Sequence, residues 1–416
     1  VRSAITRRTH GSTTPDSSGR RATRPARHAQ PVRAPVTAPD PRPLPLLRAM
    51  IDAVDHDLLQ LVARRMALVA EVAEYKRRHG LRVRDPARER ELLDDRARHA
   101  AAIGLPTEEI DAVFRLLLRA SREHQAARRA EVAPDEAPRT IAVVGGHGRI
   151  GRVLVQLFGE LGHRVLVADV DTPLGAGDAA AVADVTIVSV PIDVTEAVIA
   201  EVGPRVPADG LLMDVTSVKG APVAAMLAAT VDTGASVVGA HPMFGPSVHT
   251  LQGQRVVLCR GRGDAWFDWA ARTFAARGLV VTETTPDAHD RAMAVVQVLT
   301  HFQTQVLGLT LARLGTPLDE SLRFTSPAYL LELYVAARHF AQDPGLYGPL
   351  EMRNPRTGEV TAAFRAAAAE LAGVLASGDR ARFDAMFDEV RGFFGGFTDE
   401  ALAQSRHLID RIVERS

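Results

Sequence analysis

Apolar residues recur every three to four positions from Leu47 to Val72, and this pattern ends near Gly80. The spacing predicts one long amphipathic helix of about 33 residues. At about 1.5 Å per residue it would be roughly 50 Å long, more than a domain of about 80 residues can cover by itself. We therefore expect a second copy of the chain to cover its apolar face, which makes the protein a homodimer. Helical stretches at 86–101 and 107–129 complete an all-helical unit over residues 45–129.

The pattern changes after residues 130–139, a charged linker with two prolines. A β-branched run at 140–144, a glycine-rich turn, a helical stretch at 149–161 and a second run at 165–168 form a βαβ unit. Similar runs follow at 185–190, 211–215, 236–239, 256–258 and 279–282. They predict an α/β Rossmann domain with a doubly wound sheet over residues 140–286. Only helical periodicity continues over 287–416, where we expect an all-helical substrate-binding and dimerisation domain.

Composition narrows the class of protein. Residues 1–44 contain nine Arg and two Asp among many Pro, Ser and Thr, and we expect a disordered basic tail without a targeting role. The whole chain has a formal net charge of zero and 46% hydrophobic residues, which disfavours nucleic acid and membrane as partners. Cys259 is the single cysteine, and no apolar run is long enough to span a bilayer. We predict a cytoplasmic protein that acts on small molecules without a metal.

Lysine is rare in this chain. Of the 50 basic residues, only Lys76 and Lys219 are lysine. An ammonium is a compact point donor and a guanidinium is a planar fork, so a site that needs one donor at one atom can exclude arginine. The alternative is that two lysines escaped the bias toward arginine, and composition leaves both interpretations open.

Polar residues interrupt the apolar stripe of the first helix. Arg65 and Lys76 are eleven residues apart, which places them about 20° apart on one face. Arg48 lies about 260° round the helix from Arg65, so it can serve only the pocket of a neighbouring subunit. Later polar groups share faces at helical spacing: Asp85, Arg88 and Glu89, then Ser121 and Gln125. Such a set suits a small dicarboxylate, although a dimerisation helix pair with a solvated charged face gives the same pattern.

The turn at residues 146–151 reads Gly-x-Gly-x-x-Gly directly after a predicted strand. Its glycines permit a tight turn and let the backbone approach a pyrophosphate at a helix N-terminus. Asp169 ends the next strand, where a ribose hydroxyl acceptor belongs, and this favours NAD over NADP. A glycine-rich turn without a cofactor is the structural alternative. The predicted cofactor contacts are Gly146, Gly148, Arg149, Ile150, Gly151 and Asp169.

Two further segments follow predicted strands. They are Asp214–Lys219 and the run 240–246, which contains His241. The carboxyl ends of strands in such sheets face the ligand crevice. A lone histidine is more often structural, but His241 stands at a strand end before a proline-bounded loop, where side chains point into the crevice.

Residues 46–127 resemble the all-helical class of chorismate mutase across the whole unit. The resemblance implies that Arg65, and Arg48 from the partner subunit, hold the two substrate carboxylates. It places Lys76 and Gln125 on the ether oxygen, whose bond to the ring breaks in a rearrangement without covalent catalysis. The family's Asp-x-x-Arg-Glu element, which faces the ring hydroxyl and a carboxylate, and its last-helix serine match Asp85, Arg88, Glu89 and Ser121.

Residues 140–416 resemble prephenate dehydrogenase, and the order of the two activities resembles the bifunctional T-protein family. The matching segments are Ser189–Pro191, Ser217–Lys219, 241–246, His289–Asp290, His301–Phe302, Ser326–Pro327 and 338–344. The resemblance implies that His241, helped by Ser217, accepts the hydrogen bond of the ring 4-hydroxyl while hydride passes to NAD and carbon dioxide leaves. It also implies substrate contacts at Lys219, His301 and Arg338, and cofactor contacts at Ser189 and Pro191.

Two positions depart from the T-protein pattern. Where T-proteins have arginine, this chain has Thr300 and Leu330. Each change removes a cation from the predicted substrate pocket. An alternative substrate is therefore 4-amino-4-deoxyprephenate, in which an amino group replaces the 4-hydroxyl. An alternative of a different class is a regulatory protein that binds NAD and an aromatic ligand without turnover.

Overall fold

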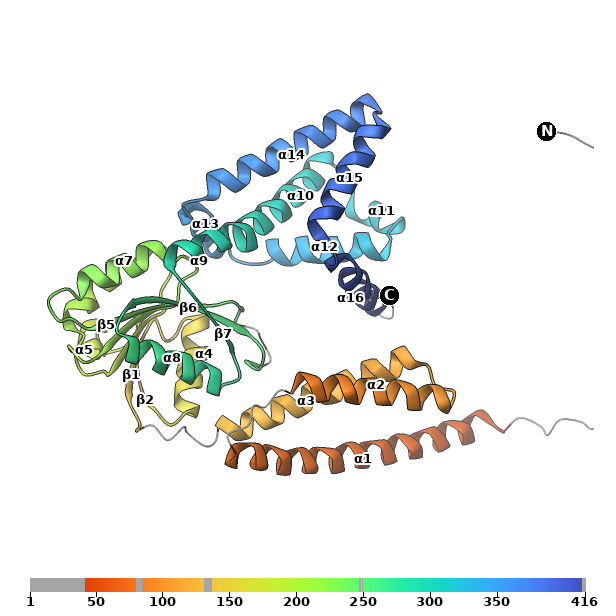
Figure 1. Ribbon diagram of the computed structural model, residues 1–416, viewed down its shortest axis with the longest axis horizontal. Helices are drawn as coiled ribbons and strands as arrows, with labels where there is room; N and C mark the ends of the chain where they lie inside the picture. Colours follow the sequence, from red (N-terminus) through yellow and green to blue (C-terminus); the bar gives the residue numbers. More distant parts are fainter. Residues whose placement is uncertain (1–41, 80–84, 131–136, 247, 249, 414–416) are drawn as a thin grey trace, which may run out of the picture. The chain divides into compact units, whose positions relative to one another are not determined.

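The computed structural model describes residues 42–79, 85–130, 137–246, 248 and 250–413 (Figure 1). Most of the predicted tail and of the linker lies outside these residues. The described elements follow the chain in three groups: helices α1 to α3, a seven-stranded sheet with its helices, and helices α9 to α16. This order confirms the predicted fold class.

The first group consists of α1 (Leu44–Arg78), α2 (Pro86–Ala102) and α3 (Thr107–Ala130). Asp85 caps α2, because its side chain accepts a hydrogen bond of 3.0 Å from the backbone N–H of Arg88. The apolar stripe of α1 is exposed in the single chain. The side chain of Leu58 is 53% exposed and that of Leu68 is 55% exposed. A contiguous apolar surface of this kind needs another surface to cover it.

The sheet has the strand order β2-β1-β3-β4-β5-β6-β7. Its strands are β1 (Thr140–Val144), β2 (Arg164–Ala168), β3 (Val185–Val188), β4 (Leu211–Asp214), β5 (Ser236–Pro242), β6 (Arg255–Arg262) and β7 (Val280–Thr284). Strands β1 to β5 are parallel, β6 runs antiparallel to β5, and β7 is parallel to β6. All seven strands occur where the apolar runs predicted them. The order reverses at β1, so β1 and its neighbour β3 define the switch point at which such sheets bind ligands.

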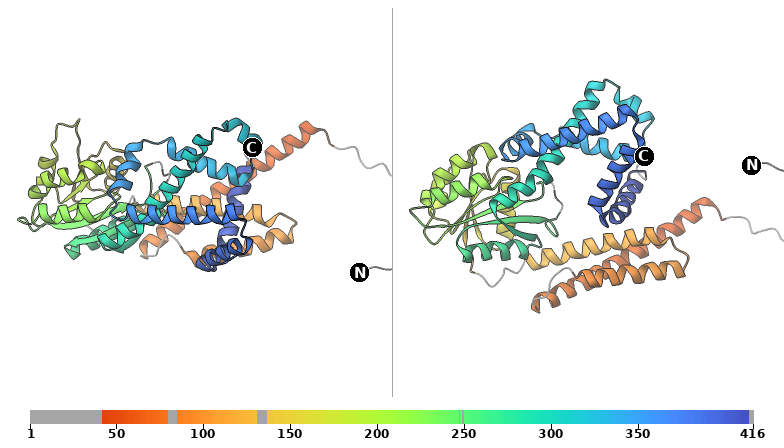
Figure 2. Two further views of the ribbon diagram at one scale, coloured as in Figure 1. Left: turned by 90° about the horizontal axis from the view of Figure 1, so that it is seen from above. Right: turned by 45° about the horizontal axis from the view of Figure 1, so that its top comes forward.

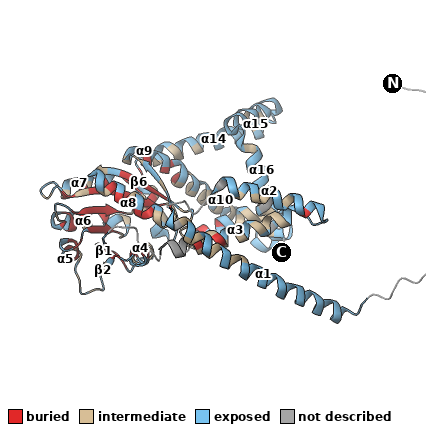
Figure 3. Cartoon of the chain, turned by 60° about the horizontal axis from the view of Figure 1, so that its bottom comes forward, coloured by how far each residue is buried: buried red, intermediate tan, exposed pale blue. Residues whose placement is uncertain are grey.

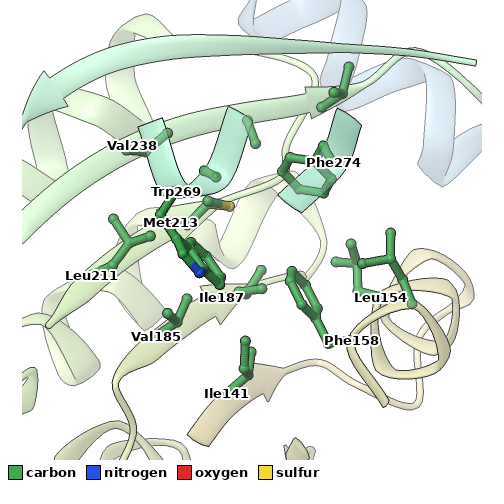
Figure 4. Close-up of a cluster of buried hydrophobic side chains, with 14 of the residues drawn as sticks. Ile141, Leu154, Phe158, Val185, Ile187, Leu211, Met213, Val238, Trp269 and Phe274 are labelled. Atoms are coloured by element: carbon green, nitrogen blue, oxygen red, sulfur yellow. The ribbon is translucent and has the colours of Figure 1, made fainter. Parts of the chain in front are cut away.

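Side chains alternate between two apolar cores on the two faces of the sheet. Figure 4 shows one core, in which Ile141, Ile187 and Met213 of the strands pack against Phe158 of α4 (Arg149–Glu160) and Phe274 of α8 (Asp264–Ala276). The other core joins the sheet to α5 (Ala176–Ala181), α6 (Ile192–Val202) and α7 (Gly220–Ala229). Strands buried on both faces hold their carboxyl ends in fixed positions, which is what a ligand site at that edge requires.

The third group begins with α9 (Pro286–Met293), which continues through the π-helical segment η2 (Ala294–Leu299) into α10 (Thr300–Leu314). It is followed by α11 (Leu318–Arg323), α12 (Pro327–Phe340), α13 (Pro344–Arg353), α14 (Thr357–Ser377), α15 (Arg380–Phe394) and α16 (Phe397–Val413). Figure 2 shows these helices from two further directions.

Burial differs sharply between these groups. Figure 3 shows the buried residues concentrated on the sheet, while α14 and α15 contain none. Among the described helices, α14 is the one that is long and apolar enough to cross a membrane, judged by length and composition only. A single helix of this kind is weak support for a membrane span, and an apolar face that another protein surface covers has the same composition.

Candidate active sites

The side chain of Arg65 reaches from α1 to α3. Its Nη1 donates hydrogen bonds to the hydroxyl of Ser121 at 2.5 Å and to the carbonyl oxygen of Leu117 at 3.2 Å. Burial, and to a smaller extent repulsion from Arg96, lowers the pKa of the Arg65 guanidinium. A guanidinium has five N–H donors, so Arg65 is held in place and still has donors for an anion.

Ser121 and Gln125 lie one turn apart on the buried face of α3. The Oε1 atom of Gln125 is buried and has no hydrogen-bond partner among the described residues. An unpaired buried polar group costs about 1–3 kcal/mol, and a ligand that hydrogen-bonds to this amide would remove the cost. Lys76 on α1 is half-buried, and Glu89 on α2 forms a half-buried ion pair with Arg122 at 2.9 Å.

The remaining predicted residues of this site lie on the surface of the described chain. Asp85 is exposed and caps α2. Arg88 is exposed and pairs with Glu91 at 2.7 Å, and the hydrogen bond from this pair raises the pKa of the guanidinium. Arg48 is exposed on the first half of α1, as a residue that serves a neighbouring subunit would be. The structure thus brings Arg65 together with Ser121 and places Asp85 and Arg88 in other contacts.

The glycine turn links β1 to α4. Gly145 has φ of 81° and its N–H donates to the carbonyl oxygen of Ala168 at 2.8 Å, so the turn begins one residue before the predicted motif. A Cβ on Gly146 would lie 2.8 Å from Val167, and one on Gly151 would lie 2.8 Å from the Cα of Gly146. These glycines therefore hold a narrow cradle at the N-terminus of α4, which is the geometry that a pyrophosphate needs.

Asp169 ends β2 beside this turn. Its Oδ2 accepts a hydrogen bond of 2.9 Å from the backbone N–H of His147, and the His147 ring contacts Asp171 at 2.7 Å. Two carboxylates therefore lie where the adenosine ribose of a dinucleotide would bind. Ser189 and Pro191 follow β3, and the backbone of Ser189 is packed against Gly145. The residues present fit a nicotinamide dinucleotide.

A buried chain of side chains leads from α9 to His241 on β5. The carboxylate of Asp290 contacts Nδ1 of His289 at 2.8 Å, and Nε2 of His289 contacts Nδ1 of His241 at 2.8 Å. Backbone N–H groups of Lys219 and Gly220 donate to Asp290 at 2.8 and 2.9 Å. Burial, reinforced by His289 and Lys219, holds the pKa of His241 well below its usual range.

This chain of contacts fixes the tautomers. A carboxylate only accepts hydrogen bonds, so Nδ1 of His289 carries a hydrogen and its Nε2 is an acceptor. His241 then donates from Nδ1, which leaves a lone pair on its Nε2. The amide nitrogen of Gln297 lies 3.3 Å from that Nε2, as a donor to a lone pair would. His241 is thus held as a neutral base whose Nε2 lone pair faces the amide of Gln297 on η2.

Lys219 was predicted to contact substrate, and its side chain is fully buried. Its ammonium forms a short ion pair with Asp214 and lies 3.3 Å from the hydroxyl of Thr216. In this structure the ammonium therefore supports the loop after β4, while its backbone N–H holds Asp290. Ser217, in the same loop, is half-buried.

His301 lies two turns after Met293, at the start of α10, among polar and aromatic side chains from α10, α12 and α13. Its ring meets the edge of Tyr347 with centroids 4.8 Å apart, and its Nδ1 lies 3.7 Å from the carboxylate of Glu351. Burial, and then the neighbouring His339, lowers the pKa of His301 to about 4. Arg338 is exposed, and its charge acts on Tyr347 in the same cluster.

Four residues of these sites are absent from the predicted site residues: His289, Asp290, Gln297 and Glu351. His289 and Asp290 were noted only as a matching motif, although a buried carboxylate beside a histidine is a known way to orient an imidazole. Gln297 gave no sequence signal, because a single amide in an apolar helix is common. Glu351 gave a weak one, as an acidic residue in a helix with few other charges.

The chain matches families described as "Chorismate mutase type II" over residues 47–126, "Prephenate dehydrogenase, nucleotide-binding domain" over 162–283 and "Prephenate dehydrogenase, dimerization domain" over 285–389. It is 37% identical to the T-protein of Enterobacter agglomerans, covering 88% of this chain and 97% of that protein. It is 34% identical to the T-protein of Haemophilus influenzae, and the alignment covers 88% of this chain and 96% of that protein. The fold of prephenate dehydrogenase from A. aeolicus, solved with hydroxyphenyl propionate and NAD+, matches with a TM-score of 0.52 at 18% identity, covering 62% of this chain and 98% of that one.

Proposed function

Because the chain belongs to the T-protein family, in which a chorismate mutase is fused to a prephenate dehydrogenase, we propose that it catalyses the two reactions with two separate sets of residues. The first set lies on α1 to α3 and the second at the carboxyl edge of the sheet. The observation that carries the dehydrogenase assignment is the buried series Asp290, His289 and His241, which holds one imidazole nitrogen ready to accept a proton.

The mutase site would hold chorismate by its charges. Arg65 binds one carboxylate, and Arg48 of the neighbouring subunit binds the other. Lys76 and the amide of Gln125 donate to the ether oxygen, on which negative charge develops as its bond to the ring breaks. The amide of Gln125 is buried on α3, one turn from Ser121, which supports a role inside this site. Glu89 orients the ring hydroxyl, whereas Asp85 and Arg88 act only if their surface contacts rearrange.

The dehydrogenase site removes a proton from the 4-hydroxyl of prephenate. Nε2 of His241 accepts this proton, while Ser217 orients the hydroxyl and Gln297 lies next to the same nitrogen. The imidazolium that forms is stabilised through His289 by the charge of Asp290. NAD, held by the glycine turn and Asp169, would supply the acceptor for the hydride that leaves the ring carbon bearing the hydroxyl. The carboxylate at the opposite ring carbon leaves as carbon dioxide, and its bonding electrons complete the aromatic ring.

We assign the cofactor as NAD rather than NADP. The carboxylates of Asp169 and Asp171 lie beside the glycine turn, and Asp169 suits the ribose hydroxyls. A ribose phosphate at this place would meet two negative charges, with His147 and Arg149 as the nearby compensating bases. Gly146, Gly148, Ile150, Gly151, Ser189 and Pro191 shape the rest of the cradle.

We also propose a cytoplasmic homodimer. The apolar face of α1 is exposed in one chain, and α14, which has no buried residue, lies in the part that matches a dimerization domain. Covering both faces in a dimer removes the apolar surface from water and brings Arg48 to the neighbouring mutase site.

One experiment tests both activities. Purified protein should consume chorismate without cofactor, and it should form NADH from prephenate and NAD. The His241→Asn variant should keep the mutase rate and lose NADH formation. A wild-type protein that forms NADH only from 4-amino-4-deoxyprephenate would move the dehydrogenase to that substrate, and a folded dimer with neither activity would refute the proposal.

A further inference from the structure

Five side chains from three helices form a polar cluster that the proposed mechanism does not use. We call it the Tyr347 cluster, and it consists of His301, Gln305, His339, Tyr347 and Glu351. Gln305 donates a hydrogen bond of 2.7 Å to Glu351, and its amide nitrogen lies 3.1 Å from Nε2 of His339. The His339 ring stacks on Tyr347 with centroids 4.0 Å apart. Packing and hydrogen bonds together fix the position of the Glu351 carboxylate.

Glu351 brings negative charge into this cluster, and within the part of the chain that the structure describes no arginine or lysine forms an ion pair with it. Its side chain is only 13% exposed, and its nearest basic group is His301 at 3.7 Å. Because the pKa of His301 is lowered to about 4, its ring is neutral near pH 7 and does not balance the carboxylate. Burial raises the pKa of Glu351, and the hydrogen bond from Gln305 opposes that rise by favouring the charged form.

Opposite charges act on the ring of Tyr347. Burial raises the pKa of the Tyr347 phenol, Arg338 lowers it and Glu351 raises it further, so a cation and an anion both act on this ring. Two carboxylates on a ligand would meet one favourable and one unfavourable charge here. A carboxylate with a neighbouring ammonium would meet two favourable charges.

The cluster lies further along the helical run of η2 and α10 than Gln297, the residue beside His241. Gln297, His301 and Gln305 follow one another at four-residue steps along η2 and α10, and Gln297 contacts the catalytic base His241 at 3.3 Å. At about 1.5 Å per residue, Gln305 lies roughly 12 Å further along the helix than Gln297. A ring whose 4-hydroxyl is at His241 and whose long axis follows this helical run would point its opposite end, with the three-carbon side chain, toward Glu351.

We propose that Glu351 is a specificity-determining residue that favours an α-amino acid side chain on the ring substrate over the α-keto acid side chain of prephenate. This inference rests on the proposed dehydrogenase function. Arogenate, in which a carbon bearing an ammonium replaces the keto carbon, is the matching substrate. The Glu351 carboxylate attracts that ammonium and repels the dianion of prephenate, so it shifts the ratio of the two rates without entering the chemical step.

The test compares NADH formation from prephenate and from arogenate by full-length wild type and two charge-removing variants. Glu351→Gln keeps an oxygen for the hydrogen bond from Gln305, and Glu351→Leu fills the space without polar groups. Both variants should raise kcat/KM for prephenate and lower kcat/KM for arogenate. The ratio of the two kcat/KM values should therefore change at least tenfold. The control Glu320→Gln removes an exposed carboxylate from α11 and should leave the ratio unchanged.

A ratio that stays within twofold of wild type in the Glu351 variants would overturn the inference. If one variant fails to fold, as its thermal unfolding curve would reveal, the other still decides. Failure of the proposed dehydrogenase function has a different signature, because the wild-type protein would then form NADH from neither substrate.

Discussion

Replacing Asp290 by Asn tests the orientation of the catalytic base. The Asp290 carboxylate accepts three hydrogen bonds, from His289 at 2.8 Å and from the backbone N–H groups of Lys219 and Gly220 at 2.8 and 2.9 Å. An asparagine amide replaces one acceptor oxygen by a donor. If that donor faces His289, both imidazole rings must change tautomer, and Nε2 of His241 then carries a hydrogen and cannot act as a base. If it faces Gly220, two donors oppose each other.

Both orientations remove a hydrogen bond to a charged group, which is worth about 1.5–3 kcal/mol. At about 1.4 kcal/mol per factor of ten, kcat of the dehydrogenase should fall roughly 10- to 150-fold. The assay is NADH formation at saturating prephenate and NAD, with the chorismate mutase rate of the same sample as a measure of enzyme concentration and thermal unfolding as the check on folding. The matched control is Asp287→Asn, which changes an exposed carboxylate on the same helix. A kcat of Asp290→Asn within twofold of wild type would show that the tautomers do not depend on Asp290.

Three further predictions follow from the two sites. Gly151→Ala puts a Cβ 2.8 Å from the Cα of Gly146, so the KM for NAD should rise at least tenfold while the mutase rate is unchanged. An unchanged KM would show that this glycine turn does not bind the pyrophosphate. Because burial lowers the pKa of His241, its ring stays neutral as the pH falls. The value of kcat/KM for prephenate should therefore stay constant down to pH 6.5 and decline only at clearly lower pH. A decline centred at or above pH 6.5 would contradict the assignment of His241 as the base. Gln125→Leu removes the buried amide and should lower the mutase kcat about 100- to 1000-fold, measured by chorismate consumption, with the dehydrogenase rate as the internal control.

Local patterns predicted the elements of the fold because each is encoded in consecutive residues. The seven apolar runs became the seven strands, and the glycine turn stands between β1 and α4 as its spacing required. The structure adds one residue to the start of the turn. Gly145 has the left-handed backbone at φ of 81°, and the motif as written begins one residue later. The sequence motif shows where glycines stand, but it does not show which of them adopts a positive φ.

Contacts between distant residues were harder to predict. His241 and His289 are 48 residues apart in sequence, and Gln297 is 56 residues from His241, so no periodicity connects them. The same limit applies to the mutase helices. Asp85 is at the N-cap of α2, and capping alone is a sufficient reason for an aspartate there. A residue type that satisfies a local rule carries little information about a ligand.

The structure explains why position 219 is a lysine in a chain whose composition favours arginine. The Lys219 side chain has no exposed surface, and its ammonium is paired with Asp214 beside Thr216. A guanidinium there would add volume to a closed space, which costs about 1–3 kcal/mol, and would bring five N–H donors to few acceptors. The composition of the chain favours arginine, but this buried space accepts only the smaller cation. Lys219 was therefore informative through the loop that holds Asp290, and hence His241.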